Sequence, residues 1–216
     1  MKKLLSLSFV MLLLLSASAQ EGQKLNAGID FSLGAHYFSG EKKDPIAAGG
    51  SIGYEYDFAF FFGVEAGFRF GGFNQKVGYP DPNIGIGSIN DPNGYYSEDI
   101  YRGTFWAPYI APKIYFPIGY DDKKDRARYI YIENRFSYTR MNLNLNKINE
   151  MAGSAHKYRF QYEIRGGYQF PVDERWAINC WLGYNTFDFS KIKPEVIRFK
   201  NSTPIQIGIG FNYILK

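Results

Sequence analysis

The chain has 216 residues, of which 19% are aromatic and 23 are glycine, and it contains a single cysteine. Tyrosine and phenylalanine favour strands and glycine weakens helices, which argues against an all-helical fold. One cysteine cannot form an intramolecular disulfide, and no Cys and His cluster is present to hold zinc, so the sequence predicts no metal site and no cofactor. A net charge of +4 without a basic stripe excludes nucleic acid as a partner.

The first 19 residues have the three parts of a secretory signal. Met1–Lys3 is cationic, Leu4–Leu15 is apolar, and Ser16–Ala19 provides small residues for a cleavage site. The apolar stretch is shorter than the roughly 20 residues that a membrane-spanning helix needs. We therefore predict a cleaved signal peptide at residues 1–19 and a single mature domain at residues 20–216. Since no later apolar run reaches spanning length, a membrane-embedded domain would have to be a closed barrel.

Two-residue alternation of apolar and polar side chains opens the mature chain and predicts strands. It covers Leu25–Phe38, Ala48–Asp57 and Phe62–Gly71. Aliphatic and aromatic side chains occupy one face of each strand, and glycine, serine and charged side chains occupy the other.

The next two predicted strands alternate less regularly. Thr104–Pro117 contains Pro108 and Pro112, each of which removes one hydrogen-bond donor from the ladder, so we expect local bulges there. Tyr129–Arg140 alternates except at Asn134, which is a polar residue in the apolar register.

Three more strands, Tyr158–Gln169, Trp176–Thr186 and Ile205–Leu215, bring the total to eight. The sequence therefore predicts an all-β fold: a single eight-stranded, antiparallel, up-and-down transmembrane β-barrel with long extracellular loops. A ten-stranded alternative would recruit Asn83–Ser88 to an extra hairpin.

Long and short connections alternate between these strands, as they do in outer-membrane barrels. The short turns fall near Phe58–Phe61, Tyr120–Arg128 and Pro171–Arg175, and the longest loop runs from Phe73 to Arg102. This alternation of lengths predicts that the short turns and both termini lie in the periplasm and that the long loops face outside.

The composition of the polar face decides which face meets lipid. A soluble barrel would expose long charged side chains, whereas this polar face is rich in glycine and serine, which suit a crowded lumen. We expect the lumen to hold acids and bases in nearly equal numbers, and therefore in interlocked pairs that plug the barrel. The predicted lumen acids are Asp30, Glu55, Asp57, Glu65, Glu133 and Glu163, and the predicted bases are Arg69, Lys113, Arg135, Arg159 and Arg165. The alternative is a small porin that passes ions or solutes.

Two segments carry a family resemblance: the proline-containing strand Tyr109–Phe116 and the glycine-alternating strand Ile207–Tyr213. Together with the signal, size and strand pattern, they resemble the small outer-membrane β-barrel family that includes OmpX and OmpA-type barrels. More closely, they look like the PorT-like outer-membrane β-barrel domain proteins of Bacteroidota. The resemblance implies a bacterial outer-membrane location, with membrane lipid and the barrel-assembly machinery as partners. It implies no reaction, because function depends on the site rather than on the fold.

Candidate chemistry is sparse. Ser154, His156 and Glu150 are the residues that a lipid hydrolase at the barrel rim would use as a triad, and His36 is the second histidine. A loop serine without an oriented acid is more often a solvated side chain. We therefore predict no catalytic residue and no enzymatic activity.

The longest predicted loop offers two binding features. The Asp-Pro-Asn steps at 81–83 and 91–93, with Glu98 and Asp99, could hold calcium, but such steps are ordinary turn residues. Exposed tyrosines could bind an extracellular protein or a glycan, or could mark the membrane boundary. They are Tyr79, Tyr95, Tyr96 and Tyr101. We predict a structural or surface-interaction role through these loops.

Overall fold

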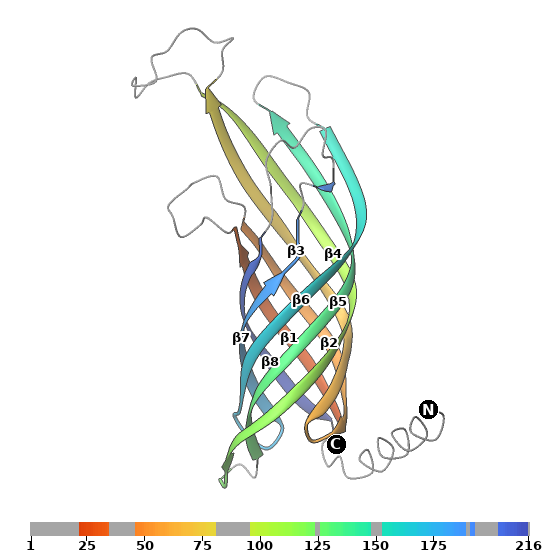
Figure 1. Ribbon diagram of the computed structural model, residues 1–216, viewed down its shortest axis with the longest axis vertical. Helices are drawn as coiled ribbons and strands as arrows, with labels where there is room; N and C mark the ends of the chain where they lie inside the picture. Colours follow the sequence, from red (N-terminus) through yellow and green to blue (C-terminus); the bar gives the residue numbers. More distant parts are fainter. Residues whose placement is uncertain are drawn as a thin grey trace, which may run out of the picture.

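The computed structural model describes residues 22–34, 46–80, 96–123, 126–147, 153–188, 191–192 and 203–215. The eight strands in these ranges form one closed antiparallel barrel (Figure 1), in which each strand pairs with its neighbours in the chain and β8 pairs with β1. The strands are β1 (Gln23–Leu33), β2 (Ile46–Ala59), β3 (Phe62–Pro80), β4 (Tyr96–Asp121), β5 (Arg126–Lys147), β6 (Gly153–Pro171), β7 (Trp176–Asn185) and β8 (Ile205–Leu215). The predicted fold class is confirmed. Asn83–Ser88, the segment of the ten-stranded alternative, lies outside the described residues.

The alternation in the sequence explains the two faces of the wall. Successive side chains of a strand point to opposite sides, so one register fills the lumen and the other covers the outside. In β1, Ile29 is 55% exposed on the outside, whereas the next residue, Asp30, is 1% exposed inside. Within the described residues the predicted faces of all eight strands are correct; residues 35–38 of the first predicted strand lie outside them. Apolar side chains outside and charged side chains inside are the reverse of a soluble barrel.

Strands β2 to β6 are longer than the sequence predicts, whereas β8 has the predicted bounds. β3 and β4 pair as far as Pro80 opposite Tyr96, so the connection between them is 81–95 and not the predicted Phe73–Arg102. β5 and β6 likewise pair up to Leu145 opposite Gly153. Backbone hydrogen bonds hold these extensions. In β5 the residues from Met141 to Asn146 still alternate, but the apolar side chains of Met141 and Leu143 occupy the inward register, the reverse of the part that crosses the membrane.

The bulges expected at Pro108 and Pro112 are absent from the described strands. Both prolines pair in unbroken register with β3, opposite Phe68 and Val64. The pairing with β5 is interrupted beside each proline and then resumes in the same register. Each proline therefore removes one hydrogen bond, but no extra residue is inserted at either position. The register between β4 and β5 shifts only between Pro117 and Gly119.

The register sets the tilt of the strands. Following the paired residues once round the barrel from Ile132 leads back to β5 at Asn142, ten residues further along the strand. A shear of this size in an eight-stranded barrel corresponds to a tilt of about 40°.

The outer face of β5 shows the height of the apolar band. Arg128 and Arg140 enclose an outward row of Ile130, Ile132, Asn134, Phe136 and Tyr138. At the tilt given above, the twelve residue steps from Arg128 to Arg140 rise about 29 Å along the barrel axis, which matches the hydrocarbon thickness of a membrane. Aromatic rings mark the upper limit of the band, where Tyr158 stacks on Tyr138 at 5.6 Å and meets Trp106 edge-on at 6.2 Å between ring centroids.

The two ends of the barrel differ. At the end with the connections 60–61, 122–125 and 172–175, here called the turn end, β1 begins and β8 finishes, with Gln23 opposite Leu215. At the other end, here called the loop end, β3 to β6 continue beyond the neighbouring strands (Figure 1). We call this part the raised sheet; it consists of 75–80, 96–102, 141–147 and 153–157. No helix within the described ranges is long and apolar enough to cross a membrane.

Candidate functional site: the charged lumen

Lys113 of β4 lies at the centre of one cluster of lumen charges. Its Nζ is 2.6 Å from Glu55 Oε2 and 3.5 Å from Glu133 Oε2, and it also contacts Glu65. The strands place these four side chains together because all occupy inward positions at similar heights on β2, β3, β4 and β5. All four side chains are at most 5% exposed, so each charge depends on its neighbours for compensation.

Arg69 of β3 forms a second cluster nearer the loop end. Its guanidinium contacts both Asp30 and Glu163, and Arg165 Nη2 donates to Glu163 Oε2 at 2.6 Å. Gln206 connects the two sides, because its Nε2 donates to Asp30 at 2.9 Å and its Oε1 accepts from Arg165 Nε at 3.1 Å. Two acids and two arginines are thus held in one ring of hydrogen bonds.

Glu133 joins the two clusters. It accepts from Arg135 Nε at 2.9 Å and lies 3.6 Å from Arg165 Nη1, in addition to its contact with Lys113. Arg135 also lies 3.7 Å from Glu65. The lumen charges therefore form a single network from β1 to β6.

Arg159 is the predicted lumen residue that stays outside this network. It occupies an inward position opposite Thr139, near the loop end, and is half-buried. It forms no ion pair with any residue that the structure describes.

Lys24 belongs to the network and is missing from the sequence prediction. Its Nζ is 2.6 Å from Asp57 and 3.6 Å from Glu55, and its side chain is 4% exposed. Lys24 occupies the inward register one residue before the predicted start of the first strand at Leu25. Extending the alternation by one residue would have found it.

Aromatic side chains complete the interior and were also missed as site residues. The hydroxyls of Tyr109 and Tyr115 donate to Glu65 and Glu55. Trp181 stands in the lumen with Arg165 5.1 Å from its ring. Rings of this size fit because glycines face them: a Cβ on Gly208, Gly167 or Gly67 would collide with Trp181, Tyr131 or Tyr109, respectively.

The lumen leaves little space for water. The interior cavity beside Lys113 and Trp181 has a volume of about 20 Å³, which is room for one water molecule. Side chains that are at most 2% exposed occur at every height, from the turn end to the loop end: Asn212, Gln169, Glu55, Glu163, Gln206, Thr139 and Met141.

An apolar cluster covers the network at the loop end. It contains Ala47, Phe73, Tyr101, Phe105, Met141, Leu143, Phe187 and Ile192, all buried. Phe187 comes from the segment after β7 and approaches Phe105 with 5.0 Å between ring centroids. Tyr101 is 1% exposed within this cluster, so its assignment to an exposed loop patch is wrong. The reason is that β4 extends through this position, which points inward.

The other candidate residues are not brought together. Tyr95, His36, Glu150 and both Asp-Pro-Asn steps lie outside the described residues, and the structure describes only the backbone of Tyr79, Tyr96, Glu98 and Asp99, within β3 and β4. Ser154 and His156 are exposed side chains on the outer face of β6 and are not hydrogen-bonded to each other.

A comparison with protein families agrees with this architecture. The family profile described as outer membrane protein beta-barrel domain matches residues 7–214. No curated protein matches the chain. Among solved structures, the chain is similar to Ail of Yersinia pestis in complex with the heparin analogue sucrose octasulfate, with 15% identity, a TM-score of 0.44, and coverage of 91% of this chain and 100% of that one. It is also similar to Neisserial surface protein A, with 9% identity, a TM-score of 0.47, and coverage of 90% of this chain and 97% of that one.

Proposed function

Because this chain belongs to the outer membrane protein beta-barrel domain family, we propose that it is a non-conducting, non-enzymatic barrel that presents its raised sheet to a macromolecule outside the cell. In this proposal the charged lumen is a structural plug, and the raised sheet and the 81–95 connection form the working surface.

The burial of the lumen side chains carries the first part of the proposal. A water-filled pore would leave its lining side chains accessible to water, yet Glu55, Gln206 and Met141, at successive heights, are each 0% exposed. An eight-stranded barrel is just wide enough to be filled by side chains. A small porin would need the network around Lys113 and the apolar cluster around Phe187 to move aside together.

The raised sheet carries the second part. β5 continues from Arg140 at the top of the apolar band to Lys147, a rise of about 17 Å above the membrane at the tilt given above. A barrel needs no such extension to span the bilayer. Arg102 and His156 are exposed on the outer face of this sheet, so it offers basic groups to a glycan or to a protein.

The lengths of the connections orient the barrel. Short turns face the periplasm in outer-membrane barrels. The turn end, with the start of β1 and the finish of β8, is therefore periplasmic, and the raised sheet is extracellular. Because Ser154 and His156 stand apart on the outer face of β6, we propose no hydrolase activity at the rim.

Two experiments test the proposal. The purified barrel, reconstituted in planar bilayers, should give no stepwise conductance, and regular single-channel steps would support the porin instead. For surface binding, cells that carry the full barrel and cells that carry a variant lacking residues 81–95 should be applied to glycan and extracellular-matrix protein arrays. The proposal predicts binding that the deletion weakens while the barrel still shifts on unheated gels; equal or absent binding by both cell types contradicts it.

A further inference from the structure

Asn134 places an amide in the middle of the lipid-facing band. It points outward from β5, halfway between Arg128 and Arg140 at the two limits of the band. Tyr162 on β6 donates a hydrogen bond to its Oδ1 at 2.6 Å. No described residue accepts a hydrogen bond from the Asn134 amide nitrogen, which therefore carries two unpaired N–H groups.

Unpaired amide N–H groups are costly in hydrocarbon, because no water is present to accept their hydrogen bonds. Polar side chains at this depth generally pair with another protein segment. Lipid cannot supply the acceptor, since the ester and phosphate oxygens of lipids lie near the membrane surfaces, more than 10 Å away. An asparagine amide contains both donor and acceptor atoms, so a second Asn134 would complement it.

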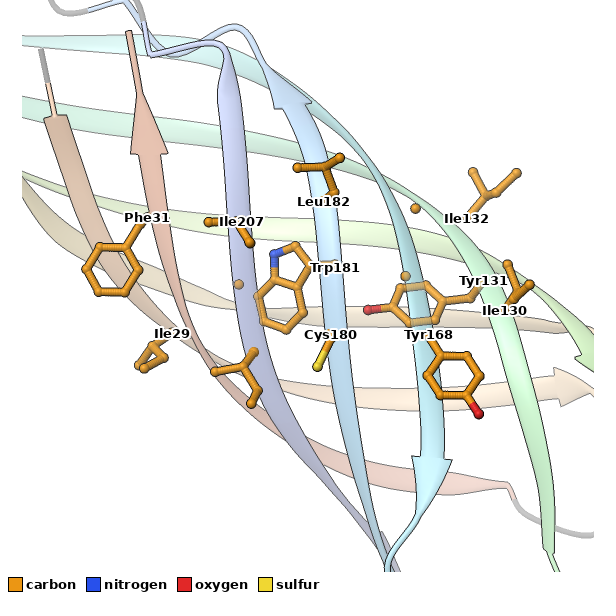
Figure 2. A pocket seen from close by; sticks show the side chains of 14 residues that line it. Ile29, Phe31, Ile130, Tyr131, Ile132, Tyr168, Cys180, Trp181, Leu182 and Ile207 are labelled. Carbon is orange, nitrogen blue, oxygen red and sulfur yellow. The ribbon is translucent and has the colours of Figure 1, made fainter. Parts of the chain in front are cut away.

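The wall next to β5 is hollowed, over a stretch that is lined by residues of β5 to β8 and β1 and begins one outward position below Asn134. Gly166 points outward next to Ile132 and Ile164, and a Cβ built on it meets no atom within 4 Å. The hollow over it has a volume of about 680 Å³ and an almost entirely apolar lining. Figure 2 shows Ile130, Ile132, Tyr168 and Leu182 around this space, with Tyr131 and Trp181 on the lumen side of the wall.

We propose that this face of β4, β5 and β6 is an interface between two copies of the chain, with Asn134 on the two-fold axis. Both copies insert into the membrane in the same direction, so the axis runs along the membrane normal. A residue on such an axis meets its own counterpart, and the two Asn134 amides exchange hydrogen bonds.

The same axis brings an apolar side chain to the β5–β6 side of the hollow. A two-fold axis at β5 places β4 of one copy opposite β6 of the other. Ile110 of β4 projects outward at 52% exposure and is paired with Phe136, next to Asn134 on the outer face. It therefore comes to face the hollow over Gly166 of the second copy. The interface has a polar centre and an apolar surround without any change of fold.

Cross-linking in outer membranes tests the proposal. Ile164, paired with Asn134 and 41% exposed, is replaced by cysteine in a Cys180→Ser background, and the membranes are treated with a short bis-maleimide. The matched control is Ile52→Cys on β2, which is 58% exposed on another face. We expect dimers at Ile164→Cys and none above background at Ile52→Cys. Equal cross-linking at both positions would overturn the proposal.

Asn134→Leu tests the contribution of the amide to the dimer separately from that of the apolar residues around it. Added to Ile164→Cys, it should lower the cross-linked fraction about threefold to tenfold, the range expected for hydrogen bonds between membrane segments. Leucine suits a lipid-facing position, so the variant should still fold and shift on unheated gels like the parent. Undiminished cross-linking in the folded variant contradicts the proposal. Tyr162→Phe leaves the amide in place and should keep the dimer.

Discussion

The indole ring of Trp181 lies against Gly208 of the neighbouring strand, inside the barrel. A Cβ at position 208 would overlap the ring and would also lie 2.7 Å from the carbonyl oxygen of Ile29. Trp181 has no room to retreat, because it is 7% exposed and packs beside Gly28 and Gly210 as well. We expect Gly208→Ala to lower the free energy of unfolding by about 1–3 kcal/mol, as overpacking does elsewhere. Denaturant titration of the barrel refolded in lipid vesicles measures this.

Gly119→Ala is the matched control. A Cβ at this position meets nothing within 4 Å, so its effect should stay within about 0.5 kcal/mol. Trp181→Phe combined with Gly208→Ala should recover part of the loss, since the smaller ring leaves room. Equal destabilisation by the two glycine variants would show that Trp181 does not restrict position 208.

Lys113 holds together the largest group of lumen acids. Lys113→Met leaves Glu55, Glu65 and Glu133 without their shared cation, and breaking a buried ion pair from one side costs about 3–5 kcal/mol. The unfolding free energy of the barrel should fall by that amount. Adding Glu65→Gln should restore part of it, because one of the uncompensated charges is then removed.

Arg159→Met provides the comparison for Lys113→Met. Both variants replace an inward-facing cation, but Arg159 is only half-buried and forms no ion pair within the described part of the chain. Its loss should change the unfolding free energy by less than about 1 kcal/mol. A similar cost for both variants would mean that net lumen charge, rather than the contacts of Lys113, stabilises the barrel.

The sequence predicts well which side chains point into the lumen and which point outward, because a strand has a fixed period of two. Once Ile29 is assigned outward, Asp30 must point inward, and the same rule brings Glu133 and Arg165 into the lumen. The near balance of acids and bases then makes ion pairs the expected arrangement. What the period cannot supply is the partner across the barrel: Asp30 and Arg69 are 39 residues apart in the chain, and the register that joins them is a property of the closed sheet.

The failures have several physical origins. Lys24 lies one residue before the predicted start of β1, and Tyr101 lies where backbone pairing continues β4 beyond the predicted strand. Pro108 and Pro112 were expected to disrupt the ladder, but the pairing with β3 is unbroken beside both of them. Trp181 could be placed inside by alternation, but its fit against Gly208 depends on an adjacent strand that is distant in sequence.

Phe187 closes the apolar cluster at the loop end. It is 2% exposed, lies 5.0 Å from Phe105 and 5.8 Å from Phe73 between ring centroids, and is fixed by a backbone hydrogen bond from Thr203 at 3.1 Å. Phe187→Ala should let peroxide reach Met141, which is 0% exposed in the same cluster. We expect Met141 to oxidise at least about tenfold faster. Removing a buried phenylalanine lowers the stability of the closed cluster by more than the ~1.4 kcal/mol that corresponds to a tenfold change.

Mass spectrometry of the Met141 peptide follows this oxidation. Phe211→Ala removes a ring of the same size from the outer face, where Phe211 is 50% exposed, and should leave the rate unchanged. Slow oxidation in both variants would show that the cluster stays closed without Phe187.

Asp173 gives the turn between β6 and β7 a pH dependence. Its Oδ1 accepts hydrogen bonds from the backbone N–H groups of Arg175 and Trp176, each at 2.7 Å, and these bonds hold the pKa of Asp173 below its ordinary value. A carboxyl whose pKa is lower in the folded protein stabilises the fold above its unfolded pKa, and this contribution disappears as the pH falls through the folded pKa. Wild type should therefore melt above Asp173→Asn at neutral pH, and the difference should shrink on acidification. Asp122→Asn, which changes an exposed side chain in the 122–125 turn, is the control. If the difference in melting temperature between wild type and Asp173→Asn stays constant from neutral to acidic pH, the turn needs the shape of the Asp173 side chain and not its charge.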